Sequence, residues 1–207
     1  MSKPISWRRL FVVLGTVLCL LVAGGALAGT AAAQQTVSDW NDLNDTRNDP
    51  GGDYVLTNDL NASTAGYSSV ASSSANGGKG FDPIGSFTGT FDGNGQVIEG
   101  ITIGRITGGA TVGLFSTGRG GVIEDVALED IDITGGSAAG GLAVNNFGGE
   151  IQGSYTTGTV MGDSSVGGLV GANTGEIEKS YATADVESDN TFVGGLRSEE
   201  RRVGKEC

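Results

Sequence analysis

The chain of 207 residues has no histidine, and it has only two cysteines and three prolines. The absence of histidine removes the commonest general base and the commonest metal ligand of proteins. Two cysteines, Cys19 and Cys207, are too few for a thiolate zinc site or a disulfide framework. Three prolines exclude a collagen-like chain, although the 38 glycines are far above the usual frequency. The glycine therefore meets some other repeated need of the backbone.

Basic residues are also scarce, with 12 Lys and Arg against 24 Asp and Glu and a formal net charge of −12. Because phosphate binding needs clustered Lys and Arg, we expect no nucleic-acid partner. Residues 34–196 alone carry 21 acidic and five basic side chains. Such a surface repels itself at low ionic strength and is tolerable when about 1 M salt shortens the screening length to about 3 Å. We therefore predict an exported protein of an extreme halophile, an archaeon, with an ordinary acidic secreted protein as the alternative.

The N-terminal segment has the layout of a secretory signal. An apolar stretch over residues 10–28 closes on small residues in A-x-A order. We predict a signal peptide over residues 1–33, with cleavage after Ala33 and Ala28 as the second choice. An uncleaved membrane anchor is the alternative, because about 20 apolar residues can just span a bilayer. Three basic residues, Lys3, Arg8 and Arg9, precede the stretch. The adjacent Arg8 and Arg9 resemble a twin-arginine leader.

The composition changes abruptly after Leu196. Residues 197–207 contain four of the twelve basic residues and resemble the in-frame translation of a common sequencing adapter. We interpret this segment as an artefact and exclude it from the fold, with a genuine basic tail as the alternative. We therefore expect the repeats described next to be truncated at Leu196.

A Gly-Leu pair recurs at an almost constant spacing through the second half of the chain. The pairs are Gly113-Leu114, Gly141-Leu142, Gly168-Leu169 and Gly195-Leu196. The two central copies also share the Asn145/Asn173 region, Glu150-Ile151 with Glu176-Ile177, Ser154-Tyr155 with Ser180-Tyr181, and Val160 with Val186. In the first copy the apolar positions are Ile123, Val126, Leu128, Ile131 and Ile133. Regular spacing of this kind, here about 27 residues, is typical of a repeat architecture.

The repeat predicts an all-β fold, a right-handed parallel β-helix or β-solenoid with coils of roughly 27 residues and an N-terminal cap region. In such a fold each repeat makes one coil, whose strands lie about 4.8 Å above those of the previous coil. Helices are disfavoured, because glycine costs about 1 kcal/mol per helical site and no copy has an apolar stripe of helical period. Glycine and asparagine at the corners supply the positive φ that sharp turns need.

The strand phase places two tyrosines on the outside of this solenoid. Ser180, Ala182, Ala184 and Val186 alternate on one face, and a bend at Glu178-Lys179 brings Ile177 inward with them. Tyr155 and Tyr181 then lie outward, one coil apart, as an aromatic ladder that is a candidate glycan contact. A structural ladder, or tyrosines turned inward with satisfied hydroxyls, are the alternatives that this phase leaves open.

The remaining segments precede the repeats. We assign residues 34–80 to an N-terminal cap and a Ser/Gly-rich loop, residues 81–111 to leading β-helix strands, and residues 112–196 to the repeats. A helix is expected from Asp39 to about Arg47, and an exposed loop from Ala62 to Gly80. The Asp92-Gly93-Asn94-Gly95 run predicts a turn. Asn44 and Asn61 head Asn-x-Ser/Thr sequons and are candidate N-glycosylation sites.

One copy of the repeat contains Gly168-Leu169-Val170-Gly171, followed by Asn173, Gly175, Ile177, Ser180-Tyr181-Ala182-Thr183 and Val186. This copy resembles the GLUG repeat of prokaryotic surface proteins. The resemblance runs from about Ser38 to Leu196, which is most of the predicted mature chain, and implies a surface or adhesin-like module, with no implied chemistry. It departs from the family pattern where Val144 and Ser116 replace the second glycine of two copies, and where Ala184-Asp185 stands in place of Gly158-Thr159. The repeat-defining positions are Gly113, Leu114, Gly141, Leu142, Ile151, Gly168, Leu169, Gly171 and Ile177. The leading segment resembles the region that usually precedes such repeats, through Trp40-Asn41-Asp42-Leu43, Gly52-Asp53-Tyr54-Val55-Leu56, Asp59-Leu60, Pro83-Ile84-Gly85 and Phe91-Asp92-Gly93-Asn94-Gly95.

Catalysis would need a carboxylate pair, or a calcium cluster with a basic residue. The densest acidic group is Asp125, Glu129, Asp130 and Asp132, with Arg105 and Arg119 as the nearest basic residues. Apolar residues interleave with these acids as core positions would, so we interpret them as solvated surface residues. We predict no catalytic residues, no metal site and no cofactor.

The favoured hypothesis is a non-enzymatic, exported cell-surface module that contacts surface polysaccharide or neighbouring surface proteins. A polysaccharide-active lyase or hydrolase is the alternative. Both place the protein outside the cell, and a membrane enters only through the leader or through an anchor beyond Leu196.

Overall fold

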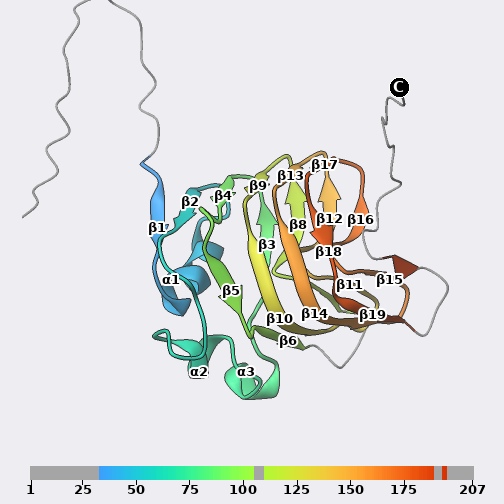
Figure 1. Cartoon of the computed structure of the whole chain (residues 1–207), viewed down its shortest axis with the longest axis horizontal. Helices are drawn as coiled ribbons and strands as arrows, with labels where there is room; N and C mark the ends of the chain where they lie inside the picture. Colours follow the sequence, from blue (N-terminus) through green and yellow to red (C-terminus); the bar gives the residue numbers. More distant parts are fainter. Residues whose placement is uncertain (1–32, 105–109, 189–192, 195–207) are drawn as a thin grey trace, which may run out of the picture. The chain divides into compact units, whose positions relative to one another are not determined.

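The computed structural model describes residues 33–104, 110–188 and 193–194. Residues 1–32 of the expected leader, Arg105, the fourth Gly-Leu pair and the segment 197–207 lie outside the described residues, and so do both cysteines. Strands dominate the described chain, which forms a β-solenoid of about four turns (Figure 1). No helix in these described ranges is long and apolar enough to cross a membrane.

The described strands form four sheets, and neighbouring strands within each sheet run parallel. Sheet A contains β1 (Gln35–Val37), β2 (Asp53–Leu56), β4 (Thr90–Asp92), β9 (Val122–Glu124), β13 (Glu150–Gln152) and β17 (Glu176–Glu178). Sheet B contains β5 (Val97–Glu99), β6 (Thr102–Gly104), β10 (Ala127–Thr134), β14 (Tyr155–Gly162), β18 (Tyr181–Ala182) and β19 (Asp185–Ser188). Sheet C contains β3 (Ile84–Phe87), β8 (Phe115–Arg119), β12 (Ala143–Phe147) and β16 (Val170–Asn173). Sheet D contains β7 (Thr111–Val112), β11 (Ala138–Gly140), β15 (Ser165–Gly167) and β20 (Val193–Gly194).

Each coil passes through sheets D, C, A and B in turn and then returns to D one layer further on. Ala139 of β11 pairs with Val112 of the previous coil and with Val166 of the next. Both partners lie one predicted repeat away along the sequence, so the predicted coil length is confirmed. In Figure 1 the layers follow one another along the chain, from the blue β1 to the orange β16 and β17.

Inward side chains of successive coils make one continuous hydrophobic core. Ile123, Ile151 and Ile177 stack in register in sheet A, and all five apolar positions predicted for the first copy are buried. Near the N-terminal coils the core becomes aromatic, with the Phe87 and Phe115 ring centroids 5.0 Å apart. Side chains buried at this depth each contribute about 1.5–3 kcal/mol of transfer free energy. The apolar positions of the repeat are therefore explained by burial in this core.

The recurrent Gly-Leu pair lies between sheets D and C. The leucine of each described pair is fully buried, as at Leu142. The glycine is there because successive coils approach too closely for a side chain, and a Cβ on Gly141 would lie 2.2 Å from the carbonyl oxygen of Gly168. A Cβ on Gly113 would likewise lie 2.5 Å from the carbonyl oxygen of Gly140. This close approach explains much of the glycine excess that the composition revealed.

The segment before the repeats contains helical turns. Helix α1 (Trp40–Asp45) begins at Asp39, whose side chain accepts hydrogen bonds from two backbone amides, and it continues into the 3-10 helix η1 (Thr46–Asn48). Its position agrees with the helix expected there.

The exposed loop expected from Ala62 to Gly80 is wrong in part. This segment contains the short helices α2 (Tyr67–Val70) and α3 (Ala75–Gly78), and it buries Val70, Ala71 and Ala75. A few small apolar residues are enough to form these helical turns, because they cover the core beside α1. The low average hydrophobicity of the segment did not reveal this burial.

A ladder of the buried Asn146 and the half-buried Asn173 ties neighbouring coils together at the corner between sheets C and A. The structure pairs Asn146 with Asn173, so the register lies one residue later than the Asn145/Asn173 match suggested. Asn146 Nδ2 donates to Asn173 Oδ1 at 2.8 Å and to the Gly149 carbonyl at 3.1 Å. A ladder of this kind satisfies corner groups that the strands leave unpaired.

We expect Asn146→Ala to destabilise the fold by about 1 kcal/mol, because it removes the hydrogen bonds of a buried amide. The Gly149 carbonyl keeps the Glu176 amide as donor, and Asn173 Oδ1 keeps the Gly175 amide. The half-buried neighbour Asn145 provides the matched control, since Asn145→Ala removes an amide of equal size without touching the ladder. Chemical unfolding at fixed salt measures both variants. Equal losses of unfolding free energy in the two variants would contradict the role assigned to the ladder.

Candidate functional site

The corner between sheets A and B sets the position of the two tyrosines. The corner residues Asp125, Gly153 and Lys179 have φ of 50°, 60° and 50°, so each coil turns through a left-handed residue at the same place. Lys179 is therefore the bend predicted at Glu178-Lys179. Positive φ reverses the inward and outward alternation, which explains why Ile177 and Ala182 both contact the core.

A serine follows each of the last two corner residues and fixes the entry to sheet B. Ser154 Oγ accepts a hydrogen bond from the Val126 amide of the previous coil at 3.1 Å, and Ser180 Oγ accepts one from the Ser154 amide at 3.1 Å. Ser154 is fully buried, and it lies directly before Tyr155. The shared Ser-Tyr dipeptides were visible in the sequence, but the corner role of the serine had no signal beyond its repetition.

Tyr155 and Tyr181 stack on the outer face of sheet B. Their backbones are paired in register, their ring centroids are 5.2 Å apart, and their planes differ by 4°. Tyr181 lies on β18, the last described strand of sheet B, and is 51% exposed. Of the alternatives left by the sequence, the inward tyrosine does not occur in this structure.

The hydroxyl of Tyr155 donates a hydrogen bond to Glu129 of the previous coil. This bond to a carboxylate, together with burial of the phenol, raises the pKa of Tyr155 to about 12. The bond holds the ring of Tyr155 in place, and the ring of Tyr181 in the next coil stacks on that ring. The pair is thus a preorganised apolar platform.

Acidic side chains surround the platform. Asp132, Thr159 and Asp185 form one outward row along sheet B, and Glu99 lies in register with Glu129. A carboxylate accepts hydrogen bonds and donates none when ionised. The outer face of sheet B therefore combines an aromatic surface with hydrogen-bond acceptors.

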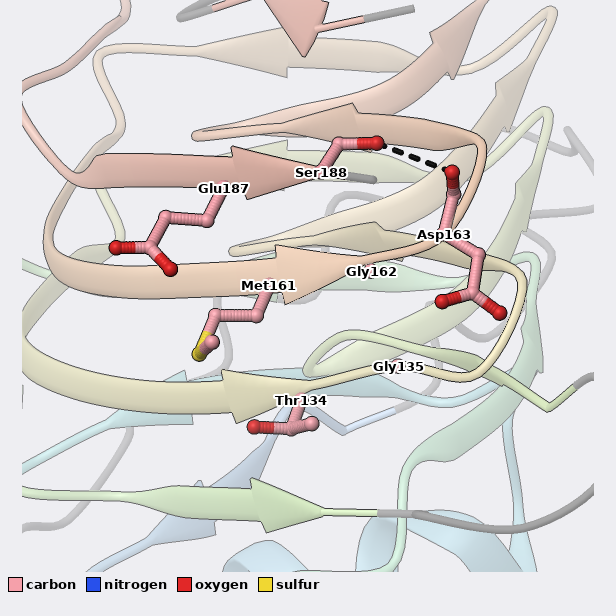
Figure 2. A pocket seen from close by; sticks show the side chains of 7 residues that line it. All are labelled: Thr134, Gly135, Met161, Gly162, Asp163, Glu187 and Ser188. Atoms are coloured by element: carbon pink, nitrogen blue, oxygen red, sulfur yellow. Dashed lines mark hydrogen bonds between the residues drawn. The ribbon is translucent and has the colours of Figure 1, made fainter. Parts of the chain in front are cut away.

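A pocket of about 200 Å³ opens where this face meets the corner to sheet D (Figure 2). Its lining comes from three successive coils: Thr134, Gly135, Met161, Gly162, Asp163, Glu187 and Ser188. Ser188 Oγ donates to the Asp163 carbonyl at 3.1 Å, which joins two of these coils. The pocket consists of strand ends from different repeats, so no local sequence pattern marked it.

Of the acidic residues considered for catalysis, Glu129, Asp130 and Asp132 lie on β10, and Asp125 lies before that strand. Glu129 bonds to Tyr155, Asp125 occupies the sheet A to B corner, and Asp130 has a φ of 50° at a bulge in β10. Arg119 ends β8 in sheet C, and Arg105 lies outside the described residues. Within the described ranges, no group of three or more His, Cys, Asp or Glu side chains is placed to hold a metal ion.

A second acidic surface runs along sheet A. Asp92, Glu124, Gln152 and Glu178 occupy one outward row, and Glu150 lies in a neighbouring row of the same sheet. Partial burial, followed by the charges of Asp92 and its neighbours, raises the pKa of Glu124. Like charges stacked at one-coil spacing therefore oppose the fold that aligns them.

Comparison with known families identifies one coil of this solenoid. Residues 162–187 match the family model described as the GLUG motif. The match runs from the end of β14 through β15, β16, β17 and β18 to β19, which is one full circuit of the four sheets. The chain contains a GLUG repeat.

The chain is also similar to a protein of known sequence. The chain is 42% identical over 126 residues to halomucin of Haloquadratum walsbyi, a halophilic archaeon, and the match covers 58% of this chain. The chain spans only 1% of the length of halomucin. No solved structure gives a significant match.

The raised pKa of Tyr155 predicts a pH dependence. Because the folded state favours the neutral phenol, this contribution to stability is complete below the ordinary pKa of 10 and is lost as the pH rises toward 12. We expect Glu129→Gln to lower the pKa of Tyr155 toward 10, as seen by ultraviolet absorbance of tyrosinate. Glu99→Gln on the same face is the control, and an unchanged titration in Glu129→Gln would contradict the assigned cause.

The raised pKa of Glu124 predicts a salt-dependent gain in stability. At neutral pH the ionised carboxylate opposes folding, so we expect Glu124→Gln to raise the unfolding free energy by about 0.5 kcal/mol at low salt. The gain should shrink at molar salt, where the repulsion is screened. Thermal unfolding at both salt concentrations tests this, with Glu178→Gln in the same row as the control. A gain that is independent of salt would rule out repulsion as its source.

Proposed function

We propose that the chain is an exported, non-enzymatic module of a cell-surface protein and that the outer face of sheet B contacts glycans. The similarity to halomucin, the GLUG repeat and the leader-like residues 1–33 support the cell-surface part of this proposal. The solenoid serves as a rigid spacer that displays this face, in an adhesin-like or structural role.

The parallel tyrosine pair is the observation that carries the glycan part. Sugar rings present a face of C–H groups, and such a face packs well on an aromatic ring. Tyr155 is already held by Glu129, so a ligand does not have to order the ring of Tyr155. The adjacent carboxylate row of Asp132 and Asp185 accepts hydrogen bonds from sugar hydroxyls.

The charge of this face favours neutral or amine-bearing sugars over acidic ones. Glu99, Glu129, Asp132 and Asp185 lie on it, and a uronate or sulfate group brought beside them is repelled. Molar salt weakens that repulsion, so discrimination is expected to be strongest at the lowest salt that keeps the protein folded.

A polysaccharide-active enzyme remains the opposing hypothesis. It requires an acid and a base that act on one bond, and a base within hydrogen-bond reach of its proton. Arg119 on sheet C does not share the face of Glu129 and Asp132 on sheet B. Turnover of a polysaccharide that is lost in Asp125→Asn or Asp130→Asn would favour the enzyme and overturn the proposal.

The proposal predicts that binding depends on the ring of Tyr181 and not on its hydroxyl. We expect Tyr181→Ala to weaken binding of a neutral polysaccharide about tenfold, which corresponds to about 1.4 kcal/mol. Tyr181→Phe keeps the ring and should bind as the parent does. Affinity electrophoresis through gels that contain a neutral glucan, a mannan or polygalacturonate measures both effects and the preference for neutral sugars.

The matched control is Thr183→Ala, which changes an exposed side chain two residues along the chain from Tyr181. Equal retardation of the parent and Tyr181→Ala in every gel, with circular dichroism showing both folded, would exclude the tyrosine platform as the glycan contact.

A further inference from the structure

The two Asn-x-Ser/Thr sequons have opposite local structures. Asn44 lies in helix α1, and its partner Thr46 begins η1. Asn61 follows the single bridge between Leu60 and Ile98, in the turn that leads toward α2. A sequon can accept a glycan in the folded protein only where it lies on an accessible surface loop.

The first sequon is tied into the fold. Thr46 is fully buried, and its Oγ1 donates to the Leu43 carbonyl at 2.8 Å. Asn44 uses both of its oxygens to accept from the Arg47 guanidinium, with Arg47 Nε 3.0 Å from the Asn44 carbonyl. A transferase could reach this hydroxyl only after α1 had unfolded.

The second sequon is more open than the first, although Asn61 itself is half-buried, as Asn44 is. Ala62 and Ser63 are exposed, and Asn61 Oδ1 accepts from the Ser63 amide at 2.9 Å and from Ser63 Oγ at 2.6 Å. Both bonds use the oxygen of the side-chain amide, and within the described part of the chain Asn61 Nδ2 has no recorded hydrogen bond. The backbone is anchored beneath it, because the Trp40 indole donates to the Asn61 carbonyl at 3.0 Å.

The surface beside Asn61 has room for a sugar. A hollow of about 350 Å³ borders the sequon and is completed by Glu99, Gly100 and Asp130. Its two carboxylates come from β5 and β10 of sheet B and can accept hydrogen bonds from sugar hydroxyls.

We propose that Asn61 is N-glycosylated after the protein has folded and that Asn44 is not, with the first sugar seated over the hollow formed by Glu99, Gly100 and Asp130. The donor is an oligosaccharide linked to a lipid phosphate. Asn61 Nδ2 forms a bond to C1 of the sugar, the bond between C1 and the phosphate oxygen breaks, the lipid phosphate leaves, and the amide proton passes to a base of the transferase. The inference rests on the export proposed above.

Trypsin separates the two sequons, because Arg47 lies between them and Lys79 follows the second. We would express the full chain in a haloarchaeal host and analyse the exported protein by peptide mass spectrometry. The expected result is a glycan mass on the peptide of residues 48–79 and none on the peptide that ends at Arg47. The mass should disappear in Asn61→Gln and Ser63→Ala and persist in Ser63→Thr.

A glycan on the peptide that ends at Arg47, or an unmodified peptide 48–79, would overturn the inference. Asp45→Ala tests the cause, because it changes only the exposed middle residue of the first sequon. Modification of Asn44 in that variant would show that sequence context, and not burial of Thr46, excluded it.

A second arm separates failure of this inference from failure of the proposed function. It replaces residues 1–33 by the leader of an exported glycoprotein of the same host. Export in this arm alone would contradict the export proposed for the native leader, and the peptide masses would still decide between Asn61 and Asn44.

Discussion

The backbone hydrogen bonds between successive coils are the constraint on which the rest of the structure depends. Leu142 N donates to the Leu169 carbonyl at 2.9 Å, and Tyr155 N donates at 2.9 Å to the carbonyl of Val126, the residue before its register partner Ala127. Because the strands are parallel and in register, equivalent positions of the repeat lie directly above one another, as Ile151 and Ile177 do and as Tyr155 and Tyr181 do. Inward side chains thereby form a continuous core, whereas outward side chains form rows along the surface of the solenoid.

Register is kept although the coils differ in length. Leu128 pairs with Thr156 and Ile131 pairs with Gly158, so the step to the next coil becomes one residue shorter between these two pairs. β10 has one residue more than β14 between these pairs, and a bulge at Asp130, whose φ is 50°, accommodates it. The loop after Asn146 is one residue longer than the loop after Asn173, and the asparagine pair spans both. Insertions are thus absorbed at corners and bulges, which leaves the ladders on the flat faces intact.

The sequence predicted the solenoid and its period because the Gly-Leu pairs recur at an almost constant spacing. Alternation within a strand allowed outward tyrosines, but it left the inward orientation open. The left-handed corner at Lys179 was also predictable, since Ile177 and Ala182 could not otherwise share the core. Features without an internal copy were not predictable. Helices α2 and α3 bury only a few small side chains, and the burial of Thr46 depends on how α1 packs. The pocket around Asp163 likewise needs three coils to be in place.

Like-on-like stacking has opposite consequences for different side chains. A tyrosine above a tyrosine forms a parallel pair whose surface is ready for a flat ligand, and its cost is low because aromatic rings attract one another. A carboxylate above a carboxylate, as at Glu150 and Glu176, repels at the same spacing. Salt screens the second interaction and leaves the first unchanged, because stacking carries no net charge. A solenoid of this composition therefore keeps its platform, and loses much of its internal repulsion, in a saline medium.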